Sequence, residues 1–345
     1  MLVGVLQKTF PYFSKANRLN TILVTGAGGY VGSVLVPKLL DLGYHVKALD
    51  LFIYGREVLE PHVELQVIEG DIRDRQLIDV ATAGSGSVIH LACISNDPSF
   101  ELNPALGKSI NLDAFQPLVE SAVANGVSRF IYASSSSVYG VKETKEVTEE
   151  MELKPLTDYS KYKALCEEIL ERYQSPSFTT VTLRPATVCG YSPRQRLDVV
   201  VNILTNLAYH TGKIRVFGGD QLRPNIHIDD MVDAYITLLQ APADLIAGQI
   251  YNAGYENHKV SVLADIVRRI VGLNKVELVT ETTDDNRSYH VSSAKFSREV
   301  GFRATRTIEN AVQDLVRAFD TKLLTDPLTN PMYSNIKRMQ EINLQ

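Results

Sequence analysis

The chain has 345 residues, a net charge of −5 at pH 7, and apolar and charged fractions of 45% and 22%. This length allows one large domain or two unequal ones with a sizeable core, and the composition is that of a soluble globular protein. The acidic balance gives no support to nucleic-acid binding, which needs a basic surface. No apolar run approaches the ~20 residues of a membrane span.

The first 20 residues precede the first strand-like run and contain Lys8, Lys15 and Arg18 among apolar residues. Because these charges do not precede the apolar part, the segment does not read as a signal peptide. We expect an N-terminal arm that packs on the body or frays, with a membrane-surface or partner-binding role as the alternative.

Three widely spaced cysteines are present: Cys93, Cys166 and Cys189. They form neither a metal-ligand pair nor a disulfide framework. We therefore expect small buried side chains, no metal site and a reducing compartment, the cytoplasm.

A glycine-rich turn, 25–32, lies between a strand-like run and an apolar segment with helical spacing. Its glycines are Gly26, Gly28, Gly29 and Gly32. Glycines let the backbone turn tightly, and the N–H groups of the following helix start face an anion, so this arrangement favours a phosphate site. Such glycines also occur in ordinary loops. Asp50 strengthens the dinucleotide interpretation, because a ribose-binding carboxylate is expected about 20 residues further on.

Strand-like and helical segments then alternate. The pattern predicts strands at 21–24, 45–50, 63–68, 87–92, 129–133 and 179–183, and helices at 109–125 and 158–173. This alternation predicts the α/β class, with a Rossmann-type doubly wound parallel sheet.

After residue 184 the rhythm changes. The sequence predicts helices at 197–210 and 229–240 and short strands at 214–217 and 249–252. We expect a dinucleotide-binding domain at 21–184, a smaller interleaved substrate-binding lobe at 185–325 and a peripheral tail at 326–345.

Tyr159 and Lys163 are one helical turn apart, so both side chains emerge on one helix face. A lysine ammonium near a phenol favours the phenolate and lowers its pKa. The pair then forms a general base for a hydroxyl proton, while a serine at the end of the fifth strand holds the oxygen. Taken alone, such a pair is in most helices a chance feature of a solvated face, and it gains meaning here from the glycine turn and the serines that meet it at one sheet edge.

These segments resemble the extended short-chain dehydrogenase/reductase family, in its nucleotide-sugar epimerase/dehydratase branch, over about residues 20–315. The motifs that carry the resemblance are the glycine turn, Gly70–Asp74, His90–Ala92, Ser134–Gly140, Tyr159–Lys163, Arg184-Pro185, Arg223–Asp230 and Arg287–Tyr289.

The resemblance implies an NAD cofactor, because a 2′-phosphate would meet the Asp50 carboxylate. It implies catalytic roles for Ser135, Tyr159 and Lys163. The implied cofactor contacts are Gly26, Gly28, Gly29, Tyr30, Val31, Gly32, Asp50, Asp71, Ile72, Leu91, Ala92, Tyr159, Lys163 and Pro185. The implied substrate contacts are Ser95, Asn96, Ser136, Ser137, Thr187, Arg194, Arg223 and Arg287, the last two as a clamp on the substrate diphosphate.

Three positions depart from the branch pattern. Dehydratases of this branch carry an Asp-Glu pair where this chain has Ser136 and Ser137. Decarboxylases carry a Glu, and 3,5-epimerases a Cys, at the second position. Serine is a poor acid or base at neutral pH, so the departure favours hydride chemistry at C4 itself. Thr187 replaces an Asn found in many members.

The resulting hypothesis is an NAD-dependent nucleotide-sugar 4-epimerase that acts on a nucleotide-diphosphate sugar by transient oxidation at C4. A 4-dehydrogenase or 4-ketoreductase with net cofactor turnover is the first alternative, and a non-catalytic NAD-binding protein is the second. By analogy with the family, the helices at 109–125 and 158–173 would pair two subunits into a homodimer.

Overall fold

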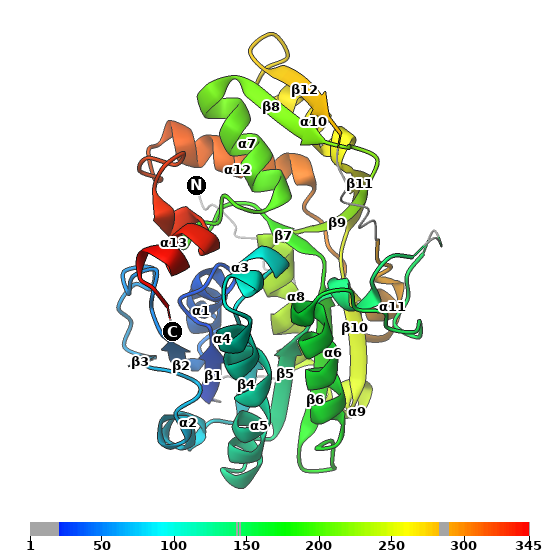
Figure 1. The fold of residues 1–345 in the computed structure, drawn as a ribbon. Helices are drawn as coiled ribbons and strands as arrows, with labels where there is room; N and C mark the ends of the chain where they lie inside the picture. The colour runs from blue at the N-terminus through cyan, green and yellow to red at the C-terminus, as the bar shows by residue number, and fades with distance from the viewer. Residues whose placement is uncertain (1–20, 143, 145, 283–289, 345) are drawn as a thin grey trace, which may run out of the picture.

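The computed structural model describes residues 21–142, 144, 146–282 and 290–344. A seven-stranded sheet forms the centre of the fold (Figure 1). Its strands are β1 (Thr21–Thr25), β2 (His45–Asp50), β3 (Leu65–Glu69), β4 (Ser87–His90), β5 (Arg129–Ala133), β6 (Thr179–Pro185) and β10 (Gln249–Ala253). They lie in the order β10-β6-β5-β4-β1-β2-β3, and every neighbouring pair is parallel.

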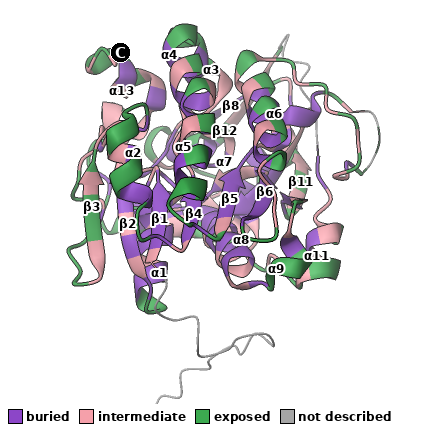
Figure 2. Ribbon diagram, turned by 90° about the horizontal axis from the view of Figure 1, so that it is seen from below, coloured by how far each residue is buried: buried purple, intermediate pink, exposed green. Residues whose placement is uncertain are grey.

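Helices cover both faces of this sheet (Figure 2). One face packs against α1 (Gly32–Asp41) and α8 (Ile228–Gln240). The other packs against α2 (Arg75–Thr82), α5 (Phe115–Ala124) and α6 (Asp158–Glu171). Central strands buried on both sides need apolar residues throughout, which explains the continuous apolar runs in the sequence. The expected Rossmann-type sheet is confirmed.

The helix expected at 109–125 is interrupted. It starts as a π-helical turn, Ser109–Asp113, and only then continues as α5. Asn111 is buried there, and its side chain accepts a hydrogen bond from the Ile94 N–H (2.8 Å) and donates to the Ile94 carbonyl (2.9 Å). The wider turn thus holds the loop that follows β4, where α3 (Asp97–Leu102) and α4 (Pro104–Lys108) lie.

A second lobe lies above the carboxyl ends of the strands (Figure 1). It contains a sheet of β7 (Thr187–Cys189), β9 (Leu222–His227) and β11 (Glu256–Lys259), and a parallel pair of β8 (Lys213–Phe217) and β12 (Glu277–Glu281). Its helices are α7 (Val200–Thr211), α10 (Val260–Val271) and α12 (Ile308–Asp320), packed around their own apolar core. Between β9 and β11 the chain returns to the central sheet as β10, followed later by α11 (Ala294–Val300); α9 (Ala243–Ile246) precedes β10.

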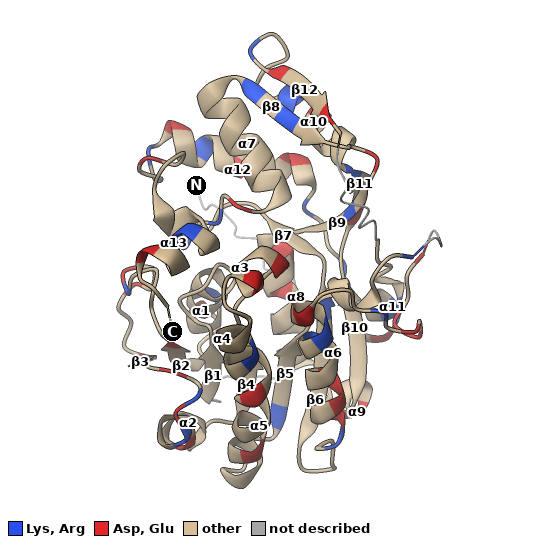
Figure 3. Ribbon diagram, in the orientation of Figure 1, with Lys and Arg blue, Asp and Glu red and all other residues tan. Residues whose placement is uncertain are grey.

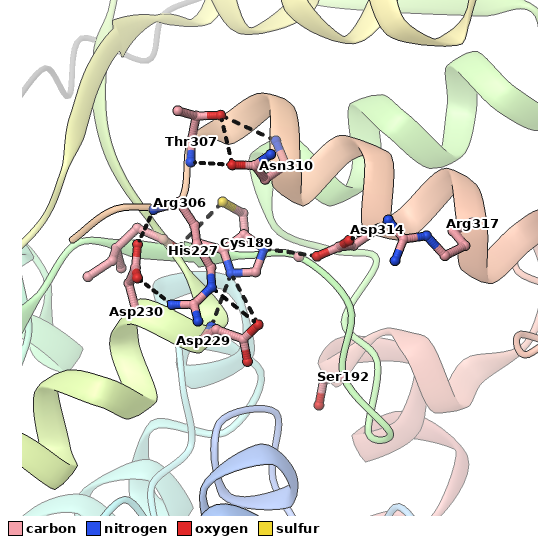
Figure 4. Close-up of polar contacts among 12 residues, drawn as sticks. Cys189, Ser192, His227, Asp229, Asp230, Arg306, Thr307, Asn310, Asp314 and Arg317 are labelled. Carbon is pink, nitrogen blue, oxygen red and sulfur yellow. Dashed lines mark hydrogen bonds and ion pairs between the residues drawn. The ribbon is translucent and has the colours of Figure 1, made fainter. Parts of the chain in front are cut away.

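A charged cluster joins the two lobes (Figure 4). Arg306, just before α12, forms an ion pair with the buried Asp230 of α8 (2.6 Å). His227 accepts a hydrogen bond from the Asp229 N–H through Nδ1, so its Nε2 carries the proton that is shared with Asp314 of α12 (3.1 Å). These contacts fix α8 of the first lobe against α12 of the second.

The segment expected to be a peripheral tail has another place in the structure. A 3-10 turn, Pro331–Tyr333, leads into α13 (Asn335–Glu341), which lies between the second lobe and the loops after β2 and β3 (Figure 1). Asn335 and Met339 are only 5% and 6% exposed. The apolar spacing of Ile336 and Met339 gives the short helix a face that packs on the body.

Both signs of charge occur in both lobes (Figure 3). None of the helices in the described residues is both long and apolar enough to cross a membrane.

Candidate active site

A cavity of about 370 Å³ opens at the carboxyl ends of the central strands. This is the edge at which ligands bind in open α/β sheets. Its lining includes these residues singled out from the sequence: Gly26, Gly29, Tyr30, Val31, Asp50, Asp71, Ile72, Leu91, Ala92, Ser95, Asn96, Ser135, Ser136, Ser137, Tyr159, Lys163, Pro185, Thr187 and Arg194. Residues spread over most of the chain therefore meet at one place.

The glycine turn is built so tightly that side chains do not fit. A Cβ on Gly26 would lie 2.6 Å from the Ala92 nitrogen, and one on Gly32 would lie 2.3 Å from the Gly26 carbonyl oxygen. Helix α1 begins at Gly32 without a side-chain cap, and the positive end of its dipole points toward the turn. Gly28 and Gly32 do not line the cavity themselves but shape its floor. These features fit the diphosphate of a dinucleotide.

Asp50 lies at the end of β2 beside this turn. Its carboxylate accepts hydrogen bonds from the N–H groups of Gly28 (3.0 Å) and Phe52 (2.7 Å). Burial raises the pKa of this carboxyl, and the two hydrogen bonds and the nearby Arg194 oppose the shift. The carboxylate is thus held in a fixed position at the cavity wall, where a ribose-binding role remains a prediction.

The three expected catalytic residues converge at the other end of the cavity. Ser135 follows β5 and caps the 3-10 turn Ser136–Tyr139, with its hydroxyl 2.8 Å from that of Ser137. Tyr159 lies in the first turn of α6, which begins with a reciprocal capping box between Thr157 and Ser160. Lys163 is 4% exposed, and its Nζ lies 5.9 Å from the Tyr159 ring centre.

One electrostatic expectation is not met. The sequence interpretation has Lys163 lowering the pKa of Tyr159, but the pKa is raised well above the ordinary tyrosine value. Burial is the main cause, with the Cys93 and Asp97 side chains adding to it, while a hydrogen bond with Ser135 and the charge of Arg196 oppose the rise. Lys163 donates to the Ala133 carbonyl (2.7 Å), so part of its charge is directed at the backbone.

A buried ion pair supports this end of the cavity from behind. Arg184 of β6 pairs with Glu167 of α6 at 2.6 Å, and both side chains are buried. Glu167 also accepts a hydrogen bond from the Ser134 hydroxyl, and Arg184 donates to the Tyr139 hydroxyl (2.7 Å). The loop that presents Ser135 is therefore held on both sides by charged groups.

The expected sugar-facing residues are partly engaged by the protein itself. Ser95 Oγ accepts hydrogen bonds from Arg196 (3.2 Å) and Asn335 (2.8 Å). Asn96 caps α3 by accepting from the Ser99 N–H. Ser136, Ser137 and Thr187 line the cavity. Positions 136 and 137 therefore contribute serine residues, and no carboxylate, to the cavity lining.

The expected phosphate-binding arginines are not all in one place. Arg194 lines the cavity. Arg223 lies on β9, outside the lining of this cavity, where its Nη1 donates to the Leu222 carbonyl (3.1 Å). Arg287 lies outside the described residues. The clamp of Arg223 and Arg287 on a substrate diphosphate therefore stays a prediction.

Several lining residues were not singled out from the sequence, among them Tyr54, Asn335 and Met339. Asp97, beside the predicted sugar-facing residues Ser95 and Asn96, and Arg196, beside Arg194, also line the cavity. The helical spacing of Ile336 and Met339 was the available signal for α13. Nothing local marks Tyr54 or Asn335, which meet across 281 positions of the chain.

The fold and cavity define a dinucleotide-binding α/β protein with a tyrosine–lysine pair beside the dinucleotide floor. Residues 22–254 match the NAD dependent epimerase/dehydratase family. The chain belongs to this family, and its cofactor is NAD.

Relatives in this family include 4-epimerases and dehydratases. The UDP-glucose 4-epimerase of Bacillus subtilis is 28% identical over 323 residues, which cover 85% of this chain and 95% of that protein. The uncharacterized protein y4nG of Sinorhizobium fredii is 33% identical over 241 residues, which cover 68% of this chain but only 56% of y4nG.

Solved structures agree on the fold. DesIV, a dTDP-glucose 4,6-dehydratase of Streptomyces venezuelae solved with NAD and TYD bound, has a TM-score of 0.80 at 23% identity and covers 90% of this chain and 100% of its own. MoeE5, solved with UDP-glucuronic acid and NAD, has a TM-score of 0.77 at 26% identity and covers 88% of this chain and 100% of its own.

Proposed function

We propose that this protein is an NAD-dependent 4-epimerase of a nucleotide-diphosphate sugar. The observation that carries the proposal is the meeting of Ser135, Tyr159 and Lys163 in one cavity, where positions 136 and 137 hold serines. This set of side chains can move a hydroxyl proton, and the loop after β5 offers no carboxylate for chemistry at a neighbouring carbon.

Bound NAD would supply the hydride chemistry: a hydride acceptor for C4 and, once the 4-keto sugar has turned in the cavity, a hydride donor to the opposite face of the same carbon. The protein residues handle the proton: the Tyr159 phenolate accepts it from the C4 hydroxyl and later gives it back. Ser135 orients the C4 oxygen by a hydrogen bond. Because burial raises the pKa of Tyr159, the phenolate needs cationic stabilisation, which Lys163 and the positively charged nicotinamide supply.

The substrate proposal is supported by the neighbours' ligands and by the cavity lining. MoeE5 was solved with UDP-glucuronic acid and with UDP-glucose, and the UDP-glucose 4-epimerase of Thermotoga maritima with UDP-glucose. Here the side chains of Ser95, Asn96 and Thr187 offer polar contacts to a sugar. We keep Arg223 and Arg287 as candidate diphosphate ligands.

A homodimer is part of the proposal. Helices α5 and α6 pack side by side on one face of the sheet (Figure 2). Val123 on α5 and Leu165 on α6 are 43% and 40% exposed, which suits a helical pairing surface.

A second candidate is a dehydratase, because one of the carboxylates that line the cavity, Asp97, lies at its catalytic end. Asp97 accepts a hydrogen bond from the hydroxyl of Thr157 (2.6 Å), which caps α6 just before Tyr159. Its charge also contributes to the raised pKa of Tyr159. An Asp in this place could remove a proton next to a C4 ketone.

The test is to incubate purified protein with UDP- and dTDP-sugars without added cofactor, and to separate the products by chromatography. Interconversion of two C4 epimers supports the proposal. A 4-keto product with enzyme-bound NADH would instead indicate the dehydrogenase alternative, and a 4-keto-6-deoxy product would indicate the dehydratase.

A further inference from the structure

The C-terminal helix α13 borders the dinucleotide side of the cavity. Met339 and Leu344 line the cavity, and Met339 belongs to the same apolar cluster as Ile72, on the loop where the adenine is expected. Arg338 donates to the carbonyl of Ile53, on the loop after β2 (2.6 Å). This segment therefore forms a wall of the cavity.

Asn335 connects α13 to three separate loops. Its side-chain oxygen accepts hydrogen bonds from the Tyr54 hydroxyl (2.9 Å) and from Arg194. Its amide donates to the Ser95 hydroxyl (2.8 Å), and its backbone N–H donates to Asp198 (2.8 Å). The buried side chain of Asn335 thus forms hydrogen bonds with the three loops that follow β2, β4 and β7.

Arg194 is 4% exposed, and its guanidinium carbon lies over the Tyr54 ring, 3.5 Å from the ring centre. Among the described residues, its Nε and Nη1 have no hydrogen-bond partner. Burying such donors without partners costs free energy, which an anionic ligand in the cavity would offset.

The position of Arg194 indicates which anion it meets. Its backbone N–H donates to the Ser33 hydroxyl in the first turn of α1 (3.3 Å), and its charge opposes the rise that burial causes in the pKa of Asp50. Arg196, two residues on, faces the other end: it donates a hydrogen bond to Ser95, and its charge opposes the rise that burial causes in the pKa of Tyr159. Arg194 therefore belongs to the glycine-turn end and not to the reacting end.

We propose that three residues of this segment, Asn335, Met339 and Leu344, form part of the NAD site: Asn335 holds Arg194 against the diphosphate of the dinucleotide, and the helix retains bound NAD. This assigns Arg194 to the cofactor, whereas the sequence assigned it to the substrate. The inference rests on NAD binding and not on the 4-epimerase proposal, so each can fail without the other.

The first experiment measures NAD retention. Asn335→Ala and a chain that ends at Ser334 are compared with wild type and with Gln340→Ala, which removes an exposed amide from the same helix. NAD remaining after gel filtration is assayed, and the Kd for NAD is measured by calorimetry on stripped protein. We expect both changes to raise the Kd at least about tenfold, as for the loss of a charged hydrogen bond, with Gln340→Ala unchanged.

Folding is checked through the melting temperature without NAD. A folded Asn335→Ala protein with wild-type Kd overturns the proposal. So does tighter NAD binding after removal of α13, because the helix would then block the site.

The second experiment separates the two diphosphates. Arg194→Lys keeps the charge but loses the fixed N–H pattern. We expect weaker NAD binding, by about tenfold, and unchanged UDP binding to NAD-loaded protein. The reverse result, weaker UDP binding with unchanged NAD affinity, would return Arg194 to the substrate site and contradict the inference.

Discussion

The two ends of the cavity are built in different ways. At the catalytic end, Ser135, Tyr159 and Lys163 come from one loop and one helix turn, and a buried ion pair holds them from behind. At the dinucleotide end, Tyr54, Arg194 and Asn335 come from three distant segments and contact one another directly. The first end is preformed by local structure, whereas the second depends on where α13 packs.

The largest expected effect is at the catalytic end. Tyr159→Phe removes the hydroxyl that exchanges the proton, so we expect turnover to fall about 10²- to 10⁴-fold. NAD content should match that of wild type, because the dinucleotide end is intact. Both are measured on one preparation, by product assay and by absorbance of released NAD. Full activity of Tyr159→Phe would show that Tyr159 is not the proton-exchanging residue. It would also contradict the non-catalytic alternative, because the protein would be an active enzyme.

The next effect is on stability. Glu167→Gln leaves the buried Arg184 charge without its partner, and we expect the free energy of unfolding to fall by about 3–5 kcal/mol. The control is Asp113→Asn, which breaks the exposed ion pair with Lys108 and should leave the free energy of unfolding nearly unchanged. Urea denaturation measures both. Equal losses would show that the ion pair does not support the catalytic end.

A pH effect comes from His90, at the end of β4. Its Nδ1 lies 2.7 Å from the Thr25 hydroxyl, and burial together with the charge of Lys163 lowers its pKa to about 3. Between this value and an unfolded pKa near 6.5, only the unfolded chain binds the proton, so stability falls as the pH falls. From pH 7 to pH 5 we expect a loss of about 2 kcal/mol from this group.

The measurement compares the unfolding free energy of wild type and His90→Asn at the two pH values. The variant should lack this part of the slope. Identical slopes would mean that His90 is not held neutral in the folded protein.

The smallest effect concerns the serine that replaces a carboxylate. Ser137→Ala removes a neutral hydrogen bond to Ser135, and we expect kcat to fall by no more than about tenfold. Steady-state kinetics compares it with Ser135→Ala, for which we expect a larger loss. A loss with Ser137→Ala as large as that for Tyr159→Phe would give Ser137 a direct chemical role.

The comparison also separates what the sequence could predict from what it could not. The glycine turn, Asp50, Tyr159 and Lys163 are motifs of short spacing, and the strand alternation predicts the central sheet. In contrast, β10 joins that sheet beside β6 although it lies within the second-lobe sequence, and Asn335 meets Tyr54 across most of the chain. Such contacts depend on tertiary packing, which local patterns do not encode.

The π-helical turn before α5 shows the same limit on a smaller scale. The apolar spacing at 109–125 is that of one helix, but the buried Asn111 bonds to both backbone groups of Ile94 and widens the turn. The raised pKa of Tyr159 is a further case, because the degree of burial is a property of the folded cavity.

The most direct test of the proposed reaction follows the hydrogen at C4. The enzyme is given a UDP-sugar deuterated at C4 in ordinary water, and the unlabelled sugar in heavy water, and both product epimers are examined by mass spectrometry and NMR. For the proposed 4-epimerase mechanism we expect the C4 deuterium to be retained in both epimers and no solvent deuterium to enter C3 or C5. Loss of the C4 label, or solvent deuterium at C5 in the manner of an Asp97-assisted elimination, would contradict it.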